Sequence, residues 1–254
     1  MNAFVHPARL IALDAVHNFR DLGGYPTADG RTTRWRTLFR ADGLYRLTSA
    51  DLEIVDGLGL RTVVDLRTEE ELELRGRFPV EYRPIRYLHV PVIDVTWAAL
   101  PEAEVTDRDP AEFLEWAYLD MLRQAPDRFA RAFEHLCEPG VLPAVFHCAA
   151  GKDRTGLLSM LVLGALGVPD DVIVDDYALT ADAVTRLREW ARRESPDLYE
   201  RLEAAPPAYI AAVPEAMHRV LGVINERHGS VRGLVDHLGV RRESIDHLSS
   251  ALLE

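Results

Sequence analysis

The chain has 254 residues, of which 48% are hydrophobic and 28% charged, and its formal net charge is −12. This length and composition are typical of an ordinary globular protein, so residues 1–254 are expected to form a single domain. The negative charge argues against a nucleic-acid partner and against general adhesion to anionic membranes, so any affinity for phosphate must be local.

The cysteines and the apolar runs indicate in which cellular compartment the protein is expected. Two cysteines suggest no disulfide framework, which fits a reducing environment. Residues 1–13 lack the basic and apolar pattern of a secretory signal. The longest apolar run, residues 157–168, is shorter than the ~20 residues that span a bilayer. We therefore expect a cytoplasmic protein without a membrane span, and export without a cleaved signal stays open.

The first half of the chain alternates predicted strands with predicted helices. After a turn at Gly23 and Gly24, strands are expected over residues 37–41, 62–67 and 86–92, and helices over 47–58 and from Thr68 onward. The third strand delivers Asp94 into a connection. The Pro, Asp, Glu and Ala content of residues 97–110 predicts a flexible surface loop there.

Two amphipathic helices follow this loop. The first carries an apolar face from Phe113 to Met121, and Pro126 should break it. The second places Cys137 on its apolar stripe, which predicts a core residue. A redox partnership of Cys137 with Cys148 is the alternative.

Residues 147–156 follow a short apolar strand and precede a helix that is apolar on every side. A loop that ends in a helix start presents unpaired backbone N–H groups and favours an anion. Cys148 would sit at the lip of this cradle, between His147 and the cations Lys152 and Arg154, which favours the thiolate. Arg154 offers a planar fork that matches two phosphate oxygens. One loop thus supplies a nucleophile and a phosphoryl-binding site.

The rest of the chain is predicted to be helical. Gly167 should end the buried helix, and Asp170 opens another. A charged stretch broken by prolines follows, and apolar spacing predicts further helices near residues 217–224, 231–238 and 245–252. Strands alternating with helices imply an α/β fold with a largely parallel central sheet flanked by helices and an all-helical C-terminal third. Ligands of such sheets bind beyond the carboxyl ends of the strands, where Cys148 falls.

The stretch His147–Gly156, HCAAGKDRTG, resembles the Cys-x5-Arg loop of the protein tyrosine phosphatase superfamily. It looks most like the atypical bacterial tyrosine and phosphoinositide phosphatases whose loop reads HCxxGKDRTG. Residues 18–24, NFRDLGG, and 65–68, DLRT, also resemble this family. The resemblance implies a tyrosine-phosphatase-like fold in which a helical segment near 181–213 can form a lid, although a solvated charged helix would have the same pattern. The C-terminal helices expected from apolar spacing then occupy residues 214–254. No cofactor is expected. Nine histidines without ligand spacing likewise indicate no metal.

The expected reaction is a two-step hydrolysis of a phosphate monoester, in which Cys148 attacks phosphorus and water cleaves the phosphocysteine. Arg154 and the loop backbone would hold the phosphoryl oxygens. Thr155 would donate its hydroxyl to the sulfur or cap the helix, and His147 would support the thiolate by hydrogen bonding. Arg20 could reach the phosphate, brace the loop, or form a structural salt bridge. The substrate-binding residues are therefore expected to be Ala149, Ala150, Gly151, Lys152, Thr155 and Arg20.

Two carboxylates compete as general acid. The resemblance points to Asp153, although the cations on either side of it favour its ionised form. Asp94 is the alternative, because ordinary members of the superfamily bring an Asp from a loop in that topological place. We favour Asp153.

Lys152 bears on the substrate, since a cation beside the reacting phosphate can bind a second phosphate, although it could simply neutralise Asp153. We rank a phosphotyrosine protein first, with phosphoinositides and phosphoserine or phosphothreonine as alternatives and inorganic phosphate as product. A sulfurtransferase or a non-catalytic phosphopeptide-binding module remains open. A nucleotide-binding loop is excluded, because Phe146 and Asp153 stand where its Gly and Ser or Thr are required.

Overall fold

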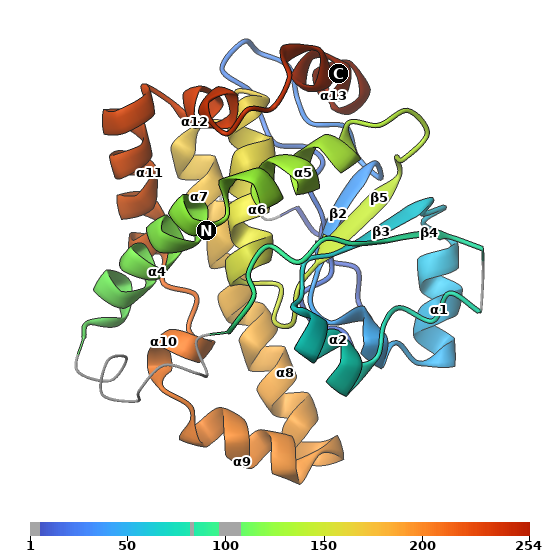
Figure 1. Cartoon of the computed structure of the whole chain (residues 1–254). Coiled ribbons are helices and arrows are strands. Elements are labelled where there is room, and N and C mark those ends of the chain that lie inside the picture. Colours follow the sequence, from blue (N-terminus) through green and yellow to red (C-terminus); the bar gives the residue numbers. More distant parts are fainter. Residues whose placement is uncertain (1–5, 82–83, 97–107) are drawn as a thin grey trace.

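The computed structural model describes residues 6–81, 84–96 and 108–254. Five of its strands form one sheet in the order β1-β2-β5-β3-β4 (Figure 1). Their bounds are Arg20–Asp21 (β1), Leu38–Ala41 (β2), Thr62–Asp65 (β3), Arg86–His89 (β4) and Ala144–His147 (β5). Only the short β1 runs antiparallel to its neighbour, so the predicted largely parallel sheet is confirmed. β4 ends earlier than expected, ahead of Pro91, which has no N–H to donate.

The first half of the chain contains the predicted helices and a short 3-10 helix that the sequence did not predict. They are the 3-10 helix Leu44–Arg46 (η1), Ser49–Asp56 (α1), Glu69–Arg75 (α2), Pro110–Gln124 (α4) and Pro126–Leu136 (α5). At both ends α1 is shorter than the expected 47–58. Thr48 and Thr68 close capping boxes with Asp51 and Glu71 at the starts of α1 and α2. Pro126 separates α4 from α5, as expected. Most of the predicted surface loop, residues 97–107, lies outside the described residues, and its end at Pro110 already belongs to α4.

The remainder of the chain after β5 is helical, which confirms the prediction for the C-terminal third. Its elements are Asp153–Ala165 (α6), Asp170–Ala178 (α7), Thr180–Glu194 (α8), Pro196–Ala204 (α9), Pro207–Ile210 (α10), Pro214–His228 (α11), Val231–His237 (α12) and Arg242–Leu252 (α13). A proline opens α9, α10 and α11, where its missing N–H is no loss. Figure 1 shows α8 and α9 extending away from the sheet. No helix among the described residues could cross a bilayer.

The sheet separates two hydrophobic clusters. Because successive strand residues point to opposite faces, Val64 and Phe146 join the cluster that contains α4 to α7 and α11 to α13, whereas Val63 and Val145 join the one that contains α1. α6 is buried along almost its whole length. The loop before α6 is therefore held between the central strand of the sheet and the most buried helix of the fold.

Candidate active site

The loop between β5 and α6 lies at the carboxyl end of the central strand, flanked by β2 and β3. Gly151 adopts a φ of +65°, and a Cβ atom there would lie 2.6 Å from the carbonyl oxygen of Ala41. Only glycine fits this position without strain. The close approach holds the loop against the end of β2.

The loop directs its carbonyl groups away from its own amides. The Gly43 amide donates to the carbonyl of Ala149 (3.0 Å), and Nδ2 of Asn18 donates to those of Ala150 and Gly151 (3.0 Å each). Within the part of the chain that the structure describes, no backbone N–H from residue 149 to residue 155 donates a hydrogen bond. These amides, at the start of α6, form a cradle suited to an anion.

Cys148 leads into this cradle and is only 1% exposed. Burial lowers the pKa of the Arg154 guanidinium, but the Cys148 sulfur and Glu71 raise it by more, so the pKa lies above its ordinary value. Burial lowers the pKa of Lys152, and Asp153 and Cys148 oppose that shift. The sulfur thus lies within electrostatic reach of both cations.

Glu71 fixes the orientation of Arg154. Its two carboxylate oxygens accept from both terminal nitrogens of the guanidinium, one at 2.9 Å. Glu71 also caps α2 by accepting from the Thr68 amide (2.9 Å). Burial raises the pKa of Glu71, but the hydrogen bonds from Arg154 outweigh this effect and bring the pKa below its ordinary value. The pair is therefore ionic. Sequence reasoning missed this role, since an acidic first turn is equally explained by the helix dipole.

Lys152 is almost fully buried and contacts the chain beyond α9. Its ammonium donates to the carbonyl oxygens of Ala208 (2.9 Å), Tyr209 (3.0 Å) and Ala211 (3.1 Å). It also lies 3.4 Å from Oδ1 of Asp153. All three ammonium donors therefore have acceptors in the segment 208–211.

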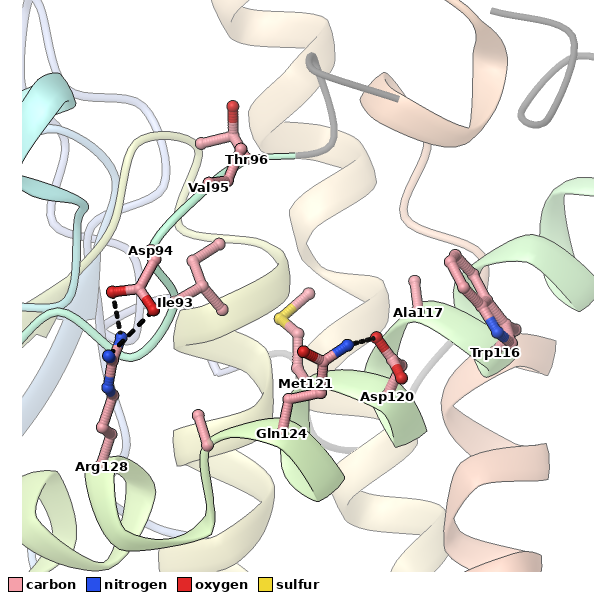
Figure 2. A pocket seen from close by; sticks show the side chains of 11 residues that line it. Ile93, Asp94, Val95, Thr96, Trp116, Ala117, Asp120, Met121, Gln124 and Arg128 are labelled. Carbon is pink, nitrogen blue, oxygen red and sulfur yellow. Dashed lines mark hydrogen bonds and ion pairs between the residues drawn. The ribbon is translucent and has the colours of Figure 1, made fainter. Parts of the chain in front are cut away.

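The two candidate acids occupy different settings. Asp153 is the first residue of α6, and Tyr118 of α4 donates to its Oδ1 (2.6 Å). Asp94 is 77% exposed, and both of its oxygens accept from Arg128 at 2.7 and 2.9 Å (Figure 2). Those hydrogen bonds lower the pKa of Asp94. The cavity beside Asp94, about 440 Å³, lies between the segment after β4 and helices α4 and α5 (Figure 2).

Arg20 lies behind the loop. Its Nε donates to Asp176 (3.0 Å), one terminal nitrogen donates to the carbonyl of Asp176 (2.8 Å), and the other donates to Oδ1 of Asn18. Asp176 also accepts from Arg40, which donates to the Gly151 carbonyl at 2.7 Å. In this arrangement Arg20 braces the loop through Asn18, which sequence reasoning had not singled out.

His147 and Thr155 complete the set of predicted residues. His147 is fully buried, which lowers its pKa, and its Nδ1 lies 3.1 Å from the carbonyl oxygen of Cys148 rather than pairing with the sulfur. Thr155 does not cap α6, whose capping position is Lys152. The Thr155 hydroxyl is buried and has no hydrogen-bond partner among the described residues.

The second cysteine stands apart from this site. Cys137 donates its thiol to the carbonyl of Phe133 (3.3 Å), and burial raises its pKa to about 12. Both cysteines are free thiols, so the structure contains no bond between Cys137 and Cys148. Across the described ranges, no three His, Cys, Asp or Glu side chains gather in a way that could hold a metal ion.

The Cys148 sulfur, a guanidinium oriented by Glu71 and the amides of residues 149–155 thus lie together at the end of a parallel strand, an arrangement suited to an anion. The chain belongs to the tyrosine phosphatase family, whose model matches residues 11–254. The family expected from the loop is therefore confirmed.

Two sequence relatives and one solved structure are similar to this chain. The triple specificity protein phosphatase PtpB of Mycobacterium tuberculosis is 30% identical over 95% of this chain and 98% of its own length. A Cupriavidus necator protein with a tyrosine-protein phosphatase name is 34% identical, and the match covers 66% of this chain and 61% of that protein. The catalytic core of the Saccharomyces cerevisiae PP-IP phosphatase Siw14 aligns at 14% identity with a TM-score of 0.39, over 76% of this chain and 94% of that one.

Proposed function

We propose that the protein hydrolyses phosphate monoesters through a phosphocysteine formed on Cys148. Residues 1–254 act as one phosphatase domain. The proposal rests on one observation. Among the described residues, the backbone N–H groups of residues 149–155 donate no hydrogen bond, and they lie beside Arg154, which Glu71 holds in place. The guanidinium and these amides bind the equatorial oxygens, where charge is spread in the transition state.

Asp153 protonates the leaving group. The position of Asp153 supports this assignment, since it lies in the same short stretch of chain as Cys148 and Arg154. Asp94, in contrast, is exposed, and both of its carboxylate oxygens accept from Arg128. To test it, Asp153→Asn and Asp94→Asn are compared on aryl phosphates of differing leaving-group pKa. The acid's variant loses most on poor leaving groups. Equal losses for the two variants would refute the assignment.

Segment 181–213 acts as a lid over this site. Cys148 and Arg154 are 1% and 7% exposed, and Lys152 is bonded to three carbonyls of this segment. A phosphoester therefore enters only when nearby chain moves. Release of residues 208–211 also frees the Lys152 ammonium, which then becomes available to a second phosphate of the substrate.

The preferred substrate is a phosphotyrosine side chain, with phosphoinositides and phosphoserine or phosphothreonine as further substrates of the open site. The name of PtpB, a triple specificity protein phosphatase, is consistent with this breadth. Lys152→Ala should reduce turnover of a phosphoinositide more than turnover of a phosphotyrosine peptide. Equal losses would mean that Lys152 has no lipid-specific role.

The test of the activity uses the two cysteines as a matched pair. Cys148→Ser should abolish phosphate release from an aryl phosphate, whereas Cys137→Ser should retain it, because Cys137 lies in the core with its thiol on Phe133. Thiosulfate turnover without phosphatase activity would identify a sulfurtransferase instead. Phosphopeptide binding without any turnover would identify a binding module.

A further inference from the structure

We infer that Tyr118 is a positioning residue for Asp153, and that it selects which carboxyl oxygen transfers the proton. The inference rests on the proposed role of Asp153 as general acid and extends it to a buried side chain of α4. Its basis is the contact between the Tyr118 hydroxyl and Oδ1 of Asp153, at 2.6 Å.

The two carboxyl oxygens of Asp153 have different surroundings. Oδ1 accepts from Tyr118 and lies 3.4 Å from the Lys152 ammonium. Oδ2 makes no hydrogen bond or ion pair within the described ranges. Since Oδ1 accepts the Tyr118 hydroxyl and faces the Lys152 ammonium, a proton on Asp153 resides on Oδ2. Oδ2 is then the oxygen that protonates the leaving group.

The direction of the hydrogen bonds is set by a chain of buried phenols. The hydroxyl groups of Tyr118 and Tyr177 are 2.8 Å apart, and both side chains are buried. An ionised carboxylate only accepts, so Tyr118 donates to Asp153 and Tyr177 must donate to Tyr118. Burial and the neighbouring carboxylate raise the pKa of Tyr118 far above its ordinary value, so it remains a donor throughout the working pH range.

This chain gives Asp153 a fixed geometry that its place at the start of α6 alone does not supply. A carboxylate at a helix start can rotate about its side-chain bonds, and a displacement of about 1 Å at a reacting group costs on the order of 10²-fold in rate. The phenol of Tyr118 comes from a different helix and removes that freedom.

The test compares Tyr118→Phe and Tyr177→Phe with the parent protein on phenyl phosphate and 4-nitrophenyl phosphate. Tyr118→Phe keeps the ring in the core and removes only the donor. We expect kcat on phenyl phosphate to fall about tenfold, with a change of less than about twofold on 4-nitrophenyl phosphate, because only the poor leaving group needs the proton. KM should stay constant. Tyr177→Phe should show a smaller loss of the same kind.

The double variant Tyr118→Phe/Asp153→Asn should lose no more than Asp153→Asn alone, since the two groups act as one unit. Losses that are equal on both substrates, or that add in the double variant, would overturn the positioning role. If Tyr118→Phe does not fold, the leaving-group dependence of Tyr177→Phe decides the question. A parent protein that forms no phosphocysteine would refute the proposed function itself, which is a different result.

Discussion

Glu71 and Arg154 form a two-pronged ion pair that joins the first turn of α2 to the first turn of α6. The two residues are 83 positions apart in sequence. The contact connects the helix after β3 to the loop after β5, and it leaves the guanidinium in one orientation beside Cys148. Arg154 is therefore held by a neighbouring helix as well as by its own.

We predict that Glu71→Gln lowers kcat/KM on an aryl phosphate by about 10- to 100-fold, because a guanidinium without its ionic partner is less well placed for the transition state. Glu70→Gln serves as the matched control, since Glu70 is its exposed neighbour on the same helix turn. Steady-state kinetics on both variants measures the difference. Equal activity of the two would mean that Glu71 only caps α2.

Lys152 is the single lysine of the chain. We predict that an amine-acylating reagent modifies its side chain at least ~10-fold more slowly in the native protein than in urea, because its ammonium is buried against residues 208–211 and reacts only when that segment opens. Peptide mass spectrometry follows the rate at Lys152. Native and unfolded rates that match would show that the segment does not cover Lys152 in solution.

Gly151→Ala should destabilise the protein by about 2–3 kcal/mol and lower activity, since the added Cβ combines a left-handed backbone with contact to the Ala41 carbonyl. Gly140→Ala is the control. Gly140 also has a positive φ, +79°, but a Cβ added there would meet no atom within 4 Å, so we expect only ~1 kcal/mol. Urea denaturation compares the two, and equal losses would show that the Ala41 contact carries no cost.

The buried pair of arginines around Asp176 predicts a pH dependence. Burial raises the pKa of Asp176, but Arg20 and Arg40 lower it well below its ordinary value near 3.8. A carboxyl group with a lowered folded-state pKa stabilises the protein above its unfolded pKa, and this stability is lost as the pH falls toward the folded value. We therefore expect the free energy of unfolding to decrease below about pH 4.

Asp176→Asn should remove that component of the pH dependence. It should also cost about 3–5 kcal/mol at neutral pH, because two guanidinium groups lose their buried partner. Asp175→Asn, next to it on α7 and less buried, should cost far less. Urea denaturation across the acid range checks both statements, and an unchanged acid slope in Asp176→Asn would contradict them.

The sequence predicted the scaffold because its signals are local. Short runs of apolar and β-branched residues define β2, β3 and β5, as expected for parallel strands buried on both faces. Thr48 and Thr68 mark the starts of α1 and α2 before any tertiary contact forms. The grouping of Cys148, Gly151 and Arg154 could likewise be predicted, because all three lie within one short stretch of the sequence.

The partners of that loop could not be predicted in the same way. Asn18, Glu71 and Tyr118 reach it across 132, 83 and 35 residues, and each has a simpler local explanation in a turn, a helix dipole or an apolar face. The same limit applies to Arg20, whose choice between phosphate and a structural ion pair depends on Asp176, which lies 156 residues away.

The central claim is that Cys148 carries the phosphoryl group during turnover. Rapid acid quenching of the protein mixed with 4-nitrophenyl phosphate, followed by peptide mass spectrometry, tests it most directly. We expect one phosphoryl group on the peptide that contains Cys148 and none on the peptide that contains Cys137. Steady phosphate release with Cys148 unmodified at every quench time, or with the phosphoryl group on another residue, would contradict it.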